Sequence, residues 1–148
     1  MITGATSGIG ARTTALFSAE GADVVIAGRR REVGEELAET LGASFFATDV
    51  TVESDVEALT TYAIERFGRL DVMVNNAGAA GTGGGIADVD LARFQQTLTL
   101  HVGGVLLGMK HAAHVMLEQQ AGSIINIASI GGRVAGWTAS TTPRRRPR

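Results

Sequence analysis

A glycine-rich turn at the start of the chain constrains the fold more than any other stretch. Gly4, Gly8 and Gly10 have the spacing G-x-x-x-G-x-G and lie between an apolar stub, Met1 and Ile2, and a run with helical character. Because glycine has no Cβ, such a turn can bring bare backbone amides against a diphosphate, and the N-terminus of the next helix adds partial positive charge. The same turn can also be a plain strand-to-helix connection, so its meaning depends on the rest of the chain.

Short apolar runs alternate with helical patterns along the chain. Helices are expected to end before Gly21 and at Gly42, the latter being a good helix stop, and Thr51 is expected to cap the following helix. Apolar side chains over 105–117 are expected to form a core-facing helix surface. After the apolar stub, strands are expected at residues 23–27, 44–47, 70–74 and 123–128. This alternation predicts an α/β protein with an open, parallel, doubly wound sheet.

The glycine and polar motifs all come directly after predicted strands. They are residues 4–10, Gly28 with Arg29, Asp49, residues 75–78 and Ser129. Ligands of open parallel sheets bind at the carboxyl ends of the strands, near the point where the strand order reverses. This shared placement predicts one ligand site and is more specific than any single motif.

Composition narrows the possible partners. The chain has 148 residues, about one domain, a formal net charge of -2 and no cysteine. The charge favours neither nucleic acid nor a membrane surface as partner, and without cysteine there is no disulfide frame or thiolate metal site. His111 and His114 have helical i, i+3 spacing but no third ligand in the sequence, so no metal is expected. With no signal peptide before the glycine turn and no apolar run of spanning length, a cytoplasmic protein is expected.

Five motifs occur in order: TGATSGIG, DVT, NNAG, GVLLGMKHA and GSIINIAS, at residues 3–10, 49–51, 75–78, 104–112 and 122–129. With them the chain resembles a classical short-chain dehydrogenase/reductase from Ile2 to about Ser140. The resemblance implies a Rossmann-type domain over 1–140, incomplete, with about five strands in the order 3-2-1-4-5, and an aberrant Arg/Pro-rich tail over 141–148. It also implies NAD(P)-dependent hydride transfer between a nicotinamide cofactor and a small alcohol or carbonyl substrate.

The resemblance assigns a role to Ser129, whose hydroxyl would hydrogen-bond to the substrate oxygen. Plain structural roles remain open: Asp49 as a turn residue ahead of a cap at Thr51, Asn75 and Asn76 as turn formers, and Ser129 as a loop hydroxyl. The cofactor contacts that the motifs imply are Gly4, Ser7, Gly8 and Ile9 at the adenosine and diphosphate, Asp49 and Val50 at the adenine, and Asn76, Ala77 and Gly78 along the rest of the cofactor.

The residues after the second predicted strand favour NADP over NAD. A carboxylate at this strand end would accept the ribose hydroxyls and repel a 2′-phosphate, but the position is Gly28. Arg29 comes next, and arginine matches phosphate geometry with two donors. Arg30 and Arg31 are interpreted as solvated surface charge, which leaves Arg29 as the predicted phosphate ligand.

The family's catalytic pair is missing from its expected positions. Where the family has a tyrosine that acts as acid and base and a lysine that supports it, this chain has Thr142 and Arg146. An aliphatic hydroxyl titrates too high to replace a phenol. The only tyrosine and lysine, Tyr62 and Lys110, lie in elements remote in sequence, and His101 stands where the family has an additional catalytic asparagine. The chain as written is therefore expected to bind a dinucleotide better than it reduces a substrate.

Residues 141–148 have the form of a frameshift product. Deleting one nucleotide from codons for Thr-Tyr-Ala-Ala-Ser-Lys-Ala-Ala, an ordinary family segment, produces Thr-Thr-Pro-Arg-Arg-Arg-Pro-Arg, the sequence observed. The rival interpretation, a basic tail for nucleic acid, lacks interleaved aromatic residues. The chain is thus expected to be truncated at both ends, and the homo-oligomer common in the family is doubtful for it. Two alternatives to the enzyme remain: a non-catalytic NADP(H)-binding fragment, and an interaction protein that pairs through the helix face at 105–117.

Overall fold

A parallel sheet forms the middle layer of the protein. In the computed structural model, which describes residues 1–81 and 85–132, the sheet has five strands in the order β3-β2-β1-β4-β5. This confirms the α/β class and the expected strand order, which reverses between β1 and β4. The strands are β1 (Ile2–Thr3), β2 (Val25–Gly28), β3 (Ser44–Ala47), β4 (Val72–Asn75) and β5 (Ser123–Asn126). Thr142, Arg146 and the predicted tail at 141–148 lie outside the described residues.

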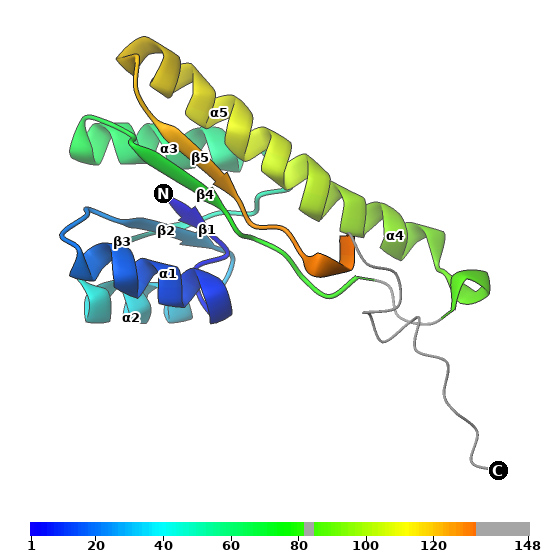
Figure 1. Cartoon of the computed structure of the whole chain (residues 1–148). Coiled ribbons are helices and arrows are strands. Elements are labelled where there is room, and N and C mark those ends of the chain that lie inside the picture. The colour runs from blue at the N-terminus through cyan, green and yellow to red at the C-terminus, as the bar shows by residue number, and fades with distance from the viewer. Residues whose placement is uncertain (82–84, 133–148) are drawn as a thin grey trace.

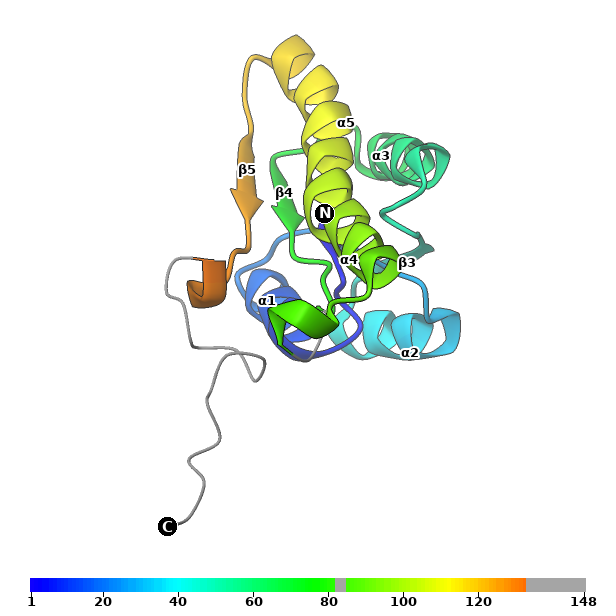
Figure 2. The ribbon, with the colours of Figure 1, turned by 90° about the vertical axis from the view of Figure 1, so that its right-hand side faces the viewer.

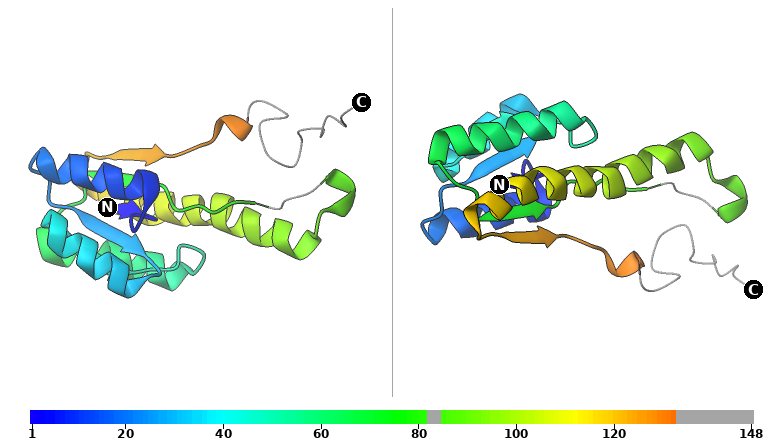
Figure 3. Two further views of the ribbon diagram at one scale, coloured as in Figure 1. Left: turned by 90° about the horizontal axis from the view of Figure 1, so that it is seen from below. Right: turned by 90° about the horizontal axis from the view of Figure 1, so that it is seen from above.

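Helices cover both faces of this sheet. The helices α1 (Gly8–Ala19) and α2 (Arg31–Leu41) lie on one face, and α3 (Glu53–Phe67) and α5 (Gly104–Gln119) lie on the other (Figures 1 and 2). The helix α4 (Leu91–Leu98) continues into α5 through a π-helical turn (Thr99–Gly103), and this pair extends past the sheet (Figure 3). Two short 3-10 helices are Ile86–Asp88 and Ile130–Gly132.

Alternation of side chains along the strands divides the core into two clusters. Val25 and Ala27 point toward α3 and α5, whereas Val24 and Ile26 point toward α1 and α2, as the two-residue period of a strand requires. The first cluster is Met1, Val25, Ala27, Leu59, Ala63, Leu70, Met73, Ala112 and Met116. The second is Ile2, Ala5, Val24, Ile26, Ala38 and Val74. Both faces of the sheet are therefore buried at β1, β2 and β4, which explains their continuous apolar runs, whereas the edge strand β5 is largely exposed.

The buried face of α5 differs from the predicted one. Small residues turn toward the sheet, and the buried positions are Gly104, Gly108, Ala112 and Met116. Leu106 and Leu117 are 62% and 68% exposed, so the expectation that residues 105–117 present a core face was wrong for them. The reason is close approach, because a Cβ at Gly108 would collide with the Oδ1 atom of Asn75 on β4.

The start of α3 also differs from the prediction. The helix begins at Glu53 with Val52 as its N-cap residue, and no side chain caps it, so the expected Thr51 cap was wrong. Thr51 instead donates its backbone N–H and its hydroxyl to Asp49 Oδ1, at 3.0 and 2.7 Å. These bonds close the loop after β3 and determine the position of the Asp49 carboxylate.

Candidate functional site

The glycine turn connects the carboxyl end of β1 to α1, and its three glycines have different surroundings. Gly4 and Gly8 have positive φ angles of 63° and 58°. A Cβ on Gly4 would lie 2.6 Å from the Cα atom of Ala77, and one on Gly10 would lie 2.6 Å from Asn76 Nδ2. A Cβ on Gly8 would meet nothing within 4 Å. Gly4 and Gly10 therefore allow the turn to pack on the end of β4, whereas Gly8 faces open space.

The amino end of α1 has the features of an anion-binding site. The helix begins at Gly8, as predicted, and Ser7 at the N-cap position makes no side-chain capping bond. The first turn contains no acidic residue that would offset the positive end of the helix dipole. Backbone N–H groups of a first helical turn have no partner within the helix, so this end can donate to a bound diphosphate.

A hydrogen-bonded scaffold joins the glycine turn to the end of β4. The hydroxyl of Thr3 accepts bonds from the backbone N–H groups of Asn76 and Ala77, at 3.1 and 3.2 Å. The Nδ2 atom of Asn76 donates to the carbonyl oxygens of Thr3 and Gly4, at 2.9 and 3.2 Å. Thr3 was not among the predicted site residues, although a threonine directly before the glycine turn is a signal that sequence reasoning could have used.

Arg30 is exposed, as expected of surface charge, but its side chain also lies across the glycine turn, which the sequence did not predict. Its Nη2 atom donates to Thr6 Oγ1 at 2.9 Å, to Ser7 Oγ at 3.0 Å and to the Thr6 carbonyl oxygen at 3.3 Å. The residue stays exposed to solvent and brings a positive charge beside the α1 N-terminus. Arg31, in contrast, pairs with Glu35 one turn along α2, as expected of surface charge.

Arg29 and Asp49 face each other at the ends of β2 and β3. Arg29 Nη1 lies 4.0 Å from Asp49 Oδ2, and both side chains are accessible to solvent. The backbone N–H and hydroxyl of Thr51 lower the pKa of Asp49 below its usual value, with a smaller contribution from Arg29. Asp49 is therefore ionised at neutral pH and offsets part of the charge of Arg29. Asp49 thus acts as a turn residue by accepting bonds from Thr51. Its side chain also lines the cavity described next, where a ligand could contact it.

These residues enclose a cavity of about 250 Å³ at the carboxyl ends of the strands. Leu100 lines it from the π-helical turn, and Thr6, Gly28, Arg30 and Thr48 line it without having been predicted as ligands. The predicted residues that line it are Gly4, Ser7, Arg29, Asp49, Val50, Ala77 and Gly78. The other predicted residues lie nearby: Gly8 and Ile9 begin α1, and Asn76 belongs to the scaffold beneath.

A wider cavity of about 710 Å³ shares Arg29 and Asp49 with the first one. Its other wall comes from α4 and the following turn, together with the loop after β4 at residues 79–81. His101 connects the turn after α4 to this loop, with its Nε2 atom 2.9 Å from the Ala79 carbonyl oxygen. The two adjoining cavities form an elongated space along the strand ends.

The candidate catalytic groups are dispersed. Ser129 is exposed after β5, and its Oγ accepts a bond from the backbone N–H of Gly131 at 3.1 Å. Tyr62 packs against Phe46 beneath α3, and Lys110 forms an ion pair on the outer surface of α3 and α5. Neither lines the two cavities, so no phenol or lysine amine from the described residues reaches this space.

The comparisons with known proteins agree with this geometry. The model of the short chain dehydrogenase family matches residues 1–141. The chain belongs to this family. Among its relatives, (+)-borneol dehydrogenase 2 of Salvia officinalis is 42% identical over 141 residues, which are 92% of this chain and 50% of the relative. Zerumbone synthase of Zingiber zerumbet is 40% identical over 141 residues, which are 92% of this chain and 53% of the relative.

A solved structure supports the same assignment. The F189W variant of actinorhodin polyketide ketoreductase, crystallised with NADPH, superimposes with a TM-score of 0.88 at 34% sequence identity. The match covers 93% of this chain and 55% of the ketoreductase. The chain thus spans about half the length of the family members it matches.

Two further findings apply to residues 1–81 and 85–132. None of their helices combines the length and the apolar character needed to cross a bilayer. No group of three His, Cys, Asp or Glu side chains comes together there as a metal site would require.

Proposed function

We propose that this chain is the dinucleotide-binding part of an NADP(H)-dependent short-chain dehydrogenase/reductase. One observation carries the proposal: two arginines line the cavity at the strand ends, and the uncapped amino end of α1, with the open side of Gly8, begins directly after Ser7 in its wall. In this proposal the amides at Gly8 and Ile9 hold the diphosphate, and the cavity at Asp49 and Val50 holds the adenine. The cofactor, when bound, supplies hydride for exchange with an alcohol or carbonyl carbon.

The preference for NADP rests on the charge at the end of β2. Gly28 presents no carboxylate to the ribose, and Arg29 and Arg30 both line the cavity. Arg30 is the stronger candidate for the 2′-phosphate, because its guanidinium already lies beside the turn, bonded to hydroxyl and carbonyl oxygens of Thr6 and Ser7. Arg29 shares its charge with Asp49 and contributes less. A free NAD ribose would gain nothing from either side chain, so NAD is the weaker ligand.

The experiment compares NADPH and NADH titrations for wild-type protein and two variants. Arg30→Ala removes a charge-assisted phosphate contact of about 1.5–3 kcal/mol. We therefore expect NADPH to bind roughly ten- to a hundredfold more weakly, with NADH affinity unchanged. Arg31→Ala is the matched control, since it removes an adjacent arginine that pairs with Glu35 and does not line the cavity. An equal loss for both cofactors, or an equal effect of the two variants, would contradict the assignment.

Catalysis is proposed to be weak or absent in this chain. Ser129 would hydrogen-bond to the substrate oxygen, but Thr142 and Arg146 cannot replace the family's tyrosine and lysine. We propose that residues 1–140 form the binding domain and that 141–148 is a frameshifted segment. The nucleotide sequence of the gene tests this, because an intact Tyr-x-x-x-Lys segment must occur in a neighbouring frame. The absence of cysteine fits a reducing compartment, and we propose a cytoplasmic location.

A second candidate function is self-association through the helix face at 105–117, and exposed apolar side chains on α5, on α4 and on the turn between them favour it. Phe94, Val102, Leu106 and Leu117 are between 42% and 68% exposed. Sedimentation across a range of protein concentrations tests this role. Dimers that dissociate in Leu106→Lys and do not respond to NADPH would favour it over cofactor binding.

A further inference from the structure

An open groove of about 440 Å³ lies between α3 and the edge strand β3. Phe46 lines it from β3, and a stripe of α3 residues at helical spacing, from Ser54 to Glu65, forms the opposite wall. Figure 2 shows β3 at the outer edge of the sheet, with α3 on one side of it and α2 on the other. No residue of this groove lines either cavity at the strand ends, so the groove is a separate feature of the surface.

One side of β3 has no neighbouring strand among the described residues, and its backbone groups are open to pairing. On the other side, the N–H groups of Ser44 and Thr48 donate to carbonyl oxygens at either end of β2, at 2.8 and 3.0 Å. Because the backbone groups of a strand alternate in direction, the N–H and C=O groups of Phe45 and Ala47 point away from β2. These two residues therefore present donors and acceptors to an added strand.

The charge around β3 is strongly negative. The helices α2 and α3 flank this strand, and each carries four acidic residues and one arginine. The whole chain has 15 acidic and 13 basic residues, so more than half of its acidic side chains lie on these two helices. Glu57 and Glu65 line the groove and are exposed. This charge favours a basic partner, whereas a second copy of the chain, paired edge to edge, would bring like charges together.

The groove also has an aromatic wall. The rings of Phe46 and Tyr62 line it, with their centroids 4.9 Å apart, and both side chains are half-buried. Arginine packs its apolar stem and its guanidinium well against such rings. A basic side chain in the groove would thus gain contacts with rings as well as with carboxylates.

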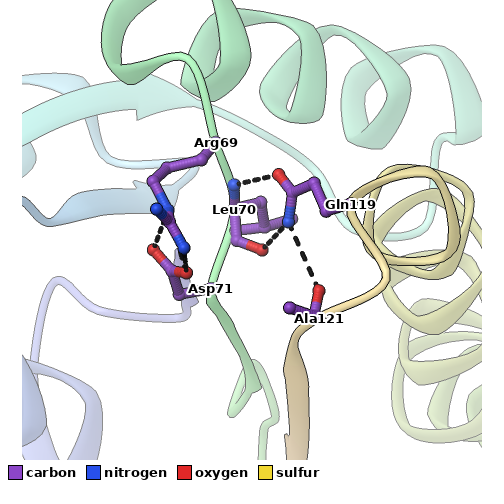
Figure 4. Close-up of polar contacts among 5 residues, drawn as sticks. All are labelled: Arg69, Leu70, Asp71, Gln119 and Ala121. Atoms are coloured by element: carbon purple, nitrogen blue, oxygen red, sulfur yellow. Dashed lines mark hydrogen bonds and ion pairs between the residues drawn. The ribbon is translucent and has the colours of Figure 1, made fainter.

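Both ends of α3 are held in place by side-chain bonds. At its start, Asp55 accepts a bond from the Asp49 N–H at 2.9 Å. After its end, Gln119 accepts from the Leu70 N–H and donates to the Leu70 carbonyl oxygen, each at 2.9 Å (Figure 4). The groove therefore has a fixed wall, and a bound peptide need not order this helix.

We propose that the β3 edge is a docking site for an extended basic peptide of another protein. The peptide adds to the sheet as a strand beside β3 and exchanges backbone hydrogen bonds with Phe45 and Ala47. Side chains of a strand alternate between faces, so every second residue of the peptide lies on the side of α3, to which Phe46 also points. Arginine or lysine at these positions meets the aromatic wall and the carboxylates of Glu57 and Glu65.

The test titrates the chain with the peptide acetyl-Val-Arg-Val-Arg-Val-amide, whose arginines share one face of a strand. The backbone amide NMR signals of Phe45 and Ala47 are expected to shift. At a peptide concentration about ten times the Kd, hydrogen exchange at these two amides is expected to slow about tenfold. Exchange at Phe46 should not change, because the alternation turns its N–H toward β2. The acidic peptide acetyl-Val-Glu-Val-Glu-Val-amide is expected not to bind.

Two matched double variants test the carboxylates. Glu57→Gln with Glu65→Gln removes both charges from the groove. The control, Glu20→Gln with Glu118→Gln, removes two exposed charges at the ends of α1 and α5, outside the groove. The first variant is expected to bind the basic peptide about three- to tenfold more weakly, and the control less than about twofold. All four side chains are exposed, so both variants should keep the wild-type melting temperature.

Equal weakening by the two double variants would show a general effect of charge and overturn the proposal. Unchanged exchange at Phe45 and Ala47 in the complex, or tight binding of the acidic peptide, would also overturn it. Spermidine is a further arm, because equal shifts of the same amides would show that charge alone is recognised. Protection of these amides that grows with protein concentration, without peptide, would identify a second copy as the occupant and refute the basic peptide. None of these measurements involves the cofactor, so the outcome is independent of the proposed function.

Discussion

Replacing single glycines by alanine tests the proposed diphosphate contact. Gly8 and Gly42 have φ angles of 58° and 64°, and a Cβ on either would meet nothing within 4 Å. Gly42 ends α2, away from the glycine turn, so Gly42→Ala measures the cost of left-handed backbone alone, about 1–2 kcal/mol. Gly4 has a similar φ of 63°, but its added Cβ would lie 2.6 Å from the Ala77 Cα atom.

The three substitutions are expected to separate packing from binding. In Gly4→Ala, the new methyl group collides with backbone, which costs about 1–3 kcal/mol in addition to the left-handed strain. The total loss of unfolding free energy is therefore about 2–5 kcal/mol. Gly8→Ala is expected to lose about as little stability as Gly42→Ala. Its methyl group would nevertheless occupy the open side of the turn, where the diphosphate is proposed to lie. We expect NADPH affinity to fall at least about tenfold in Gly8→Ala, which is about 1.4 kcal/mol, and to be unchanged in Gly42→Ala.

Urea unfolding with and without NADPH, together with a direct titration of the cofactor, provides both measurements. If Gly8→Ala bound NADPH as the wild type does, the open side of the turn would not be the diphosphate site. If Gly4→Ala were no less stable than Gly42→Ala, the packing argument for the turn would be wrong. The two outcomes are independent, because one concerns the ligand and the other the free energy of unfolding.

Three further predictions concern stability. Burial lowers the pKa of the Met1 amine from its ordinary 8.0 to about 6, so the unfolded chain binds the proton more strongly. The free energy of unfolding should therefore rise by about 2 kcal/mol from pH 6 to pH 8, and acetylation of the amine should abolish this rise in urea unfolding. Gly108→Ala places a Cβ against Asn75 and should lower the free energy of unfolding in urea by about 1–3 kcal/mol. Gly103→Ala is the control, because its Cβ would come no closer than 3.9 Å to a neighbour, and it should not lower this free energy. Lys110→Met breaks an exposed ion pair with α3 and should leave the midpoint of urea unfolding nearly unchanged, so a clear drop in the midpoint would contradict its assignment as surface charge.

Much of the site depends on local patterns. The turn at Gly8, the strand Ser44–Ala47 and the stop of α2 at Gly42 were predictable, because each depends on the conformational range of glycine or on the period of a few neighbouring side chains. The placement of Gly4 and Asp49 at one cavity was also predictable, because the carboxyl ends of parallel strands share one edge.

Other features depended on contacts between distant segments. Arg30 contacts Thr6 and Ser7 only because β2 lies beside β1, and nothing in the local sequence distinguishes Arg30 from Arg31. The buried face of α5 was mispredicted for a related reason. The hydrophobic pattern predicts that the large apolar side chains are buried. In the structure α5 lies so close to β4 that only small residues such as Gly108 fit between them.

Short-range patterns in the chain were enough to specify the alternation of strands and helices, the family and the edge of the sheet that carries the candidate site, because periodicity and glycine conformation are properties of short segments. The folded arrangement was needed to show which arginine lies over the turn and which side of α5 is buried. Those features arise where segments far apart in the chain meet, and the distances between such segments are not encoded in any one of them.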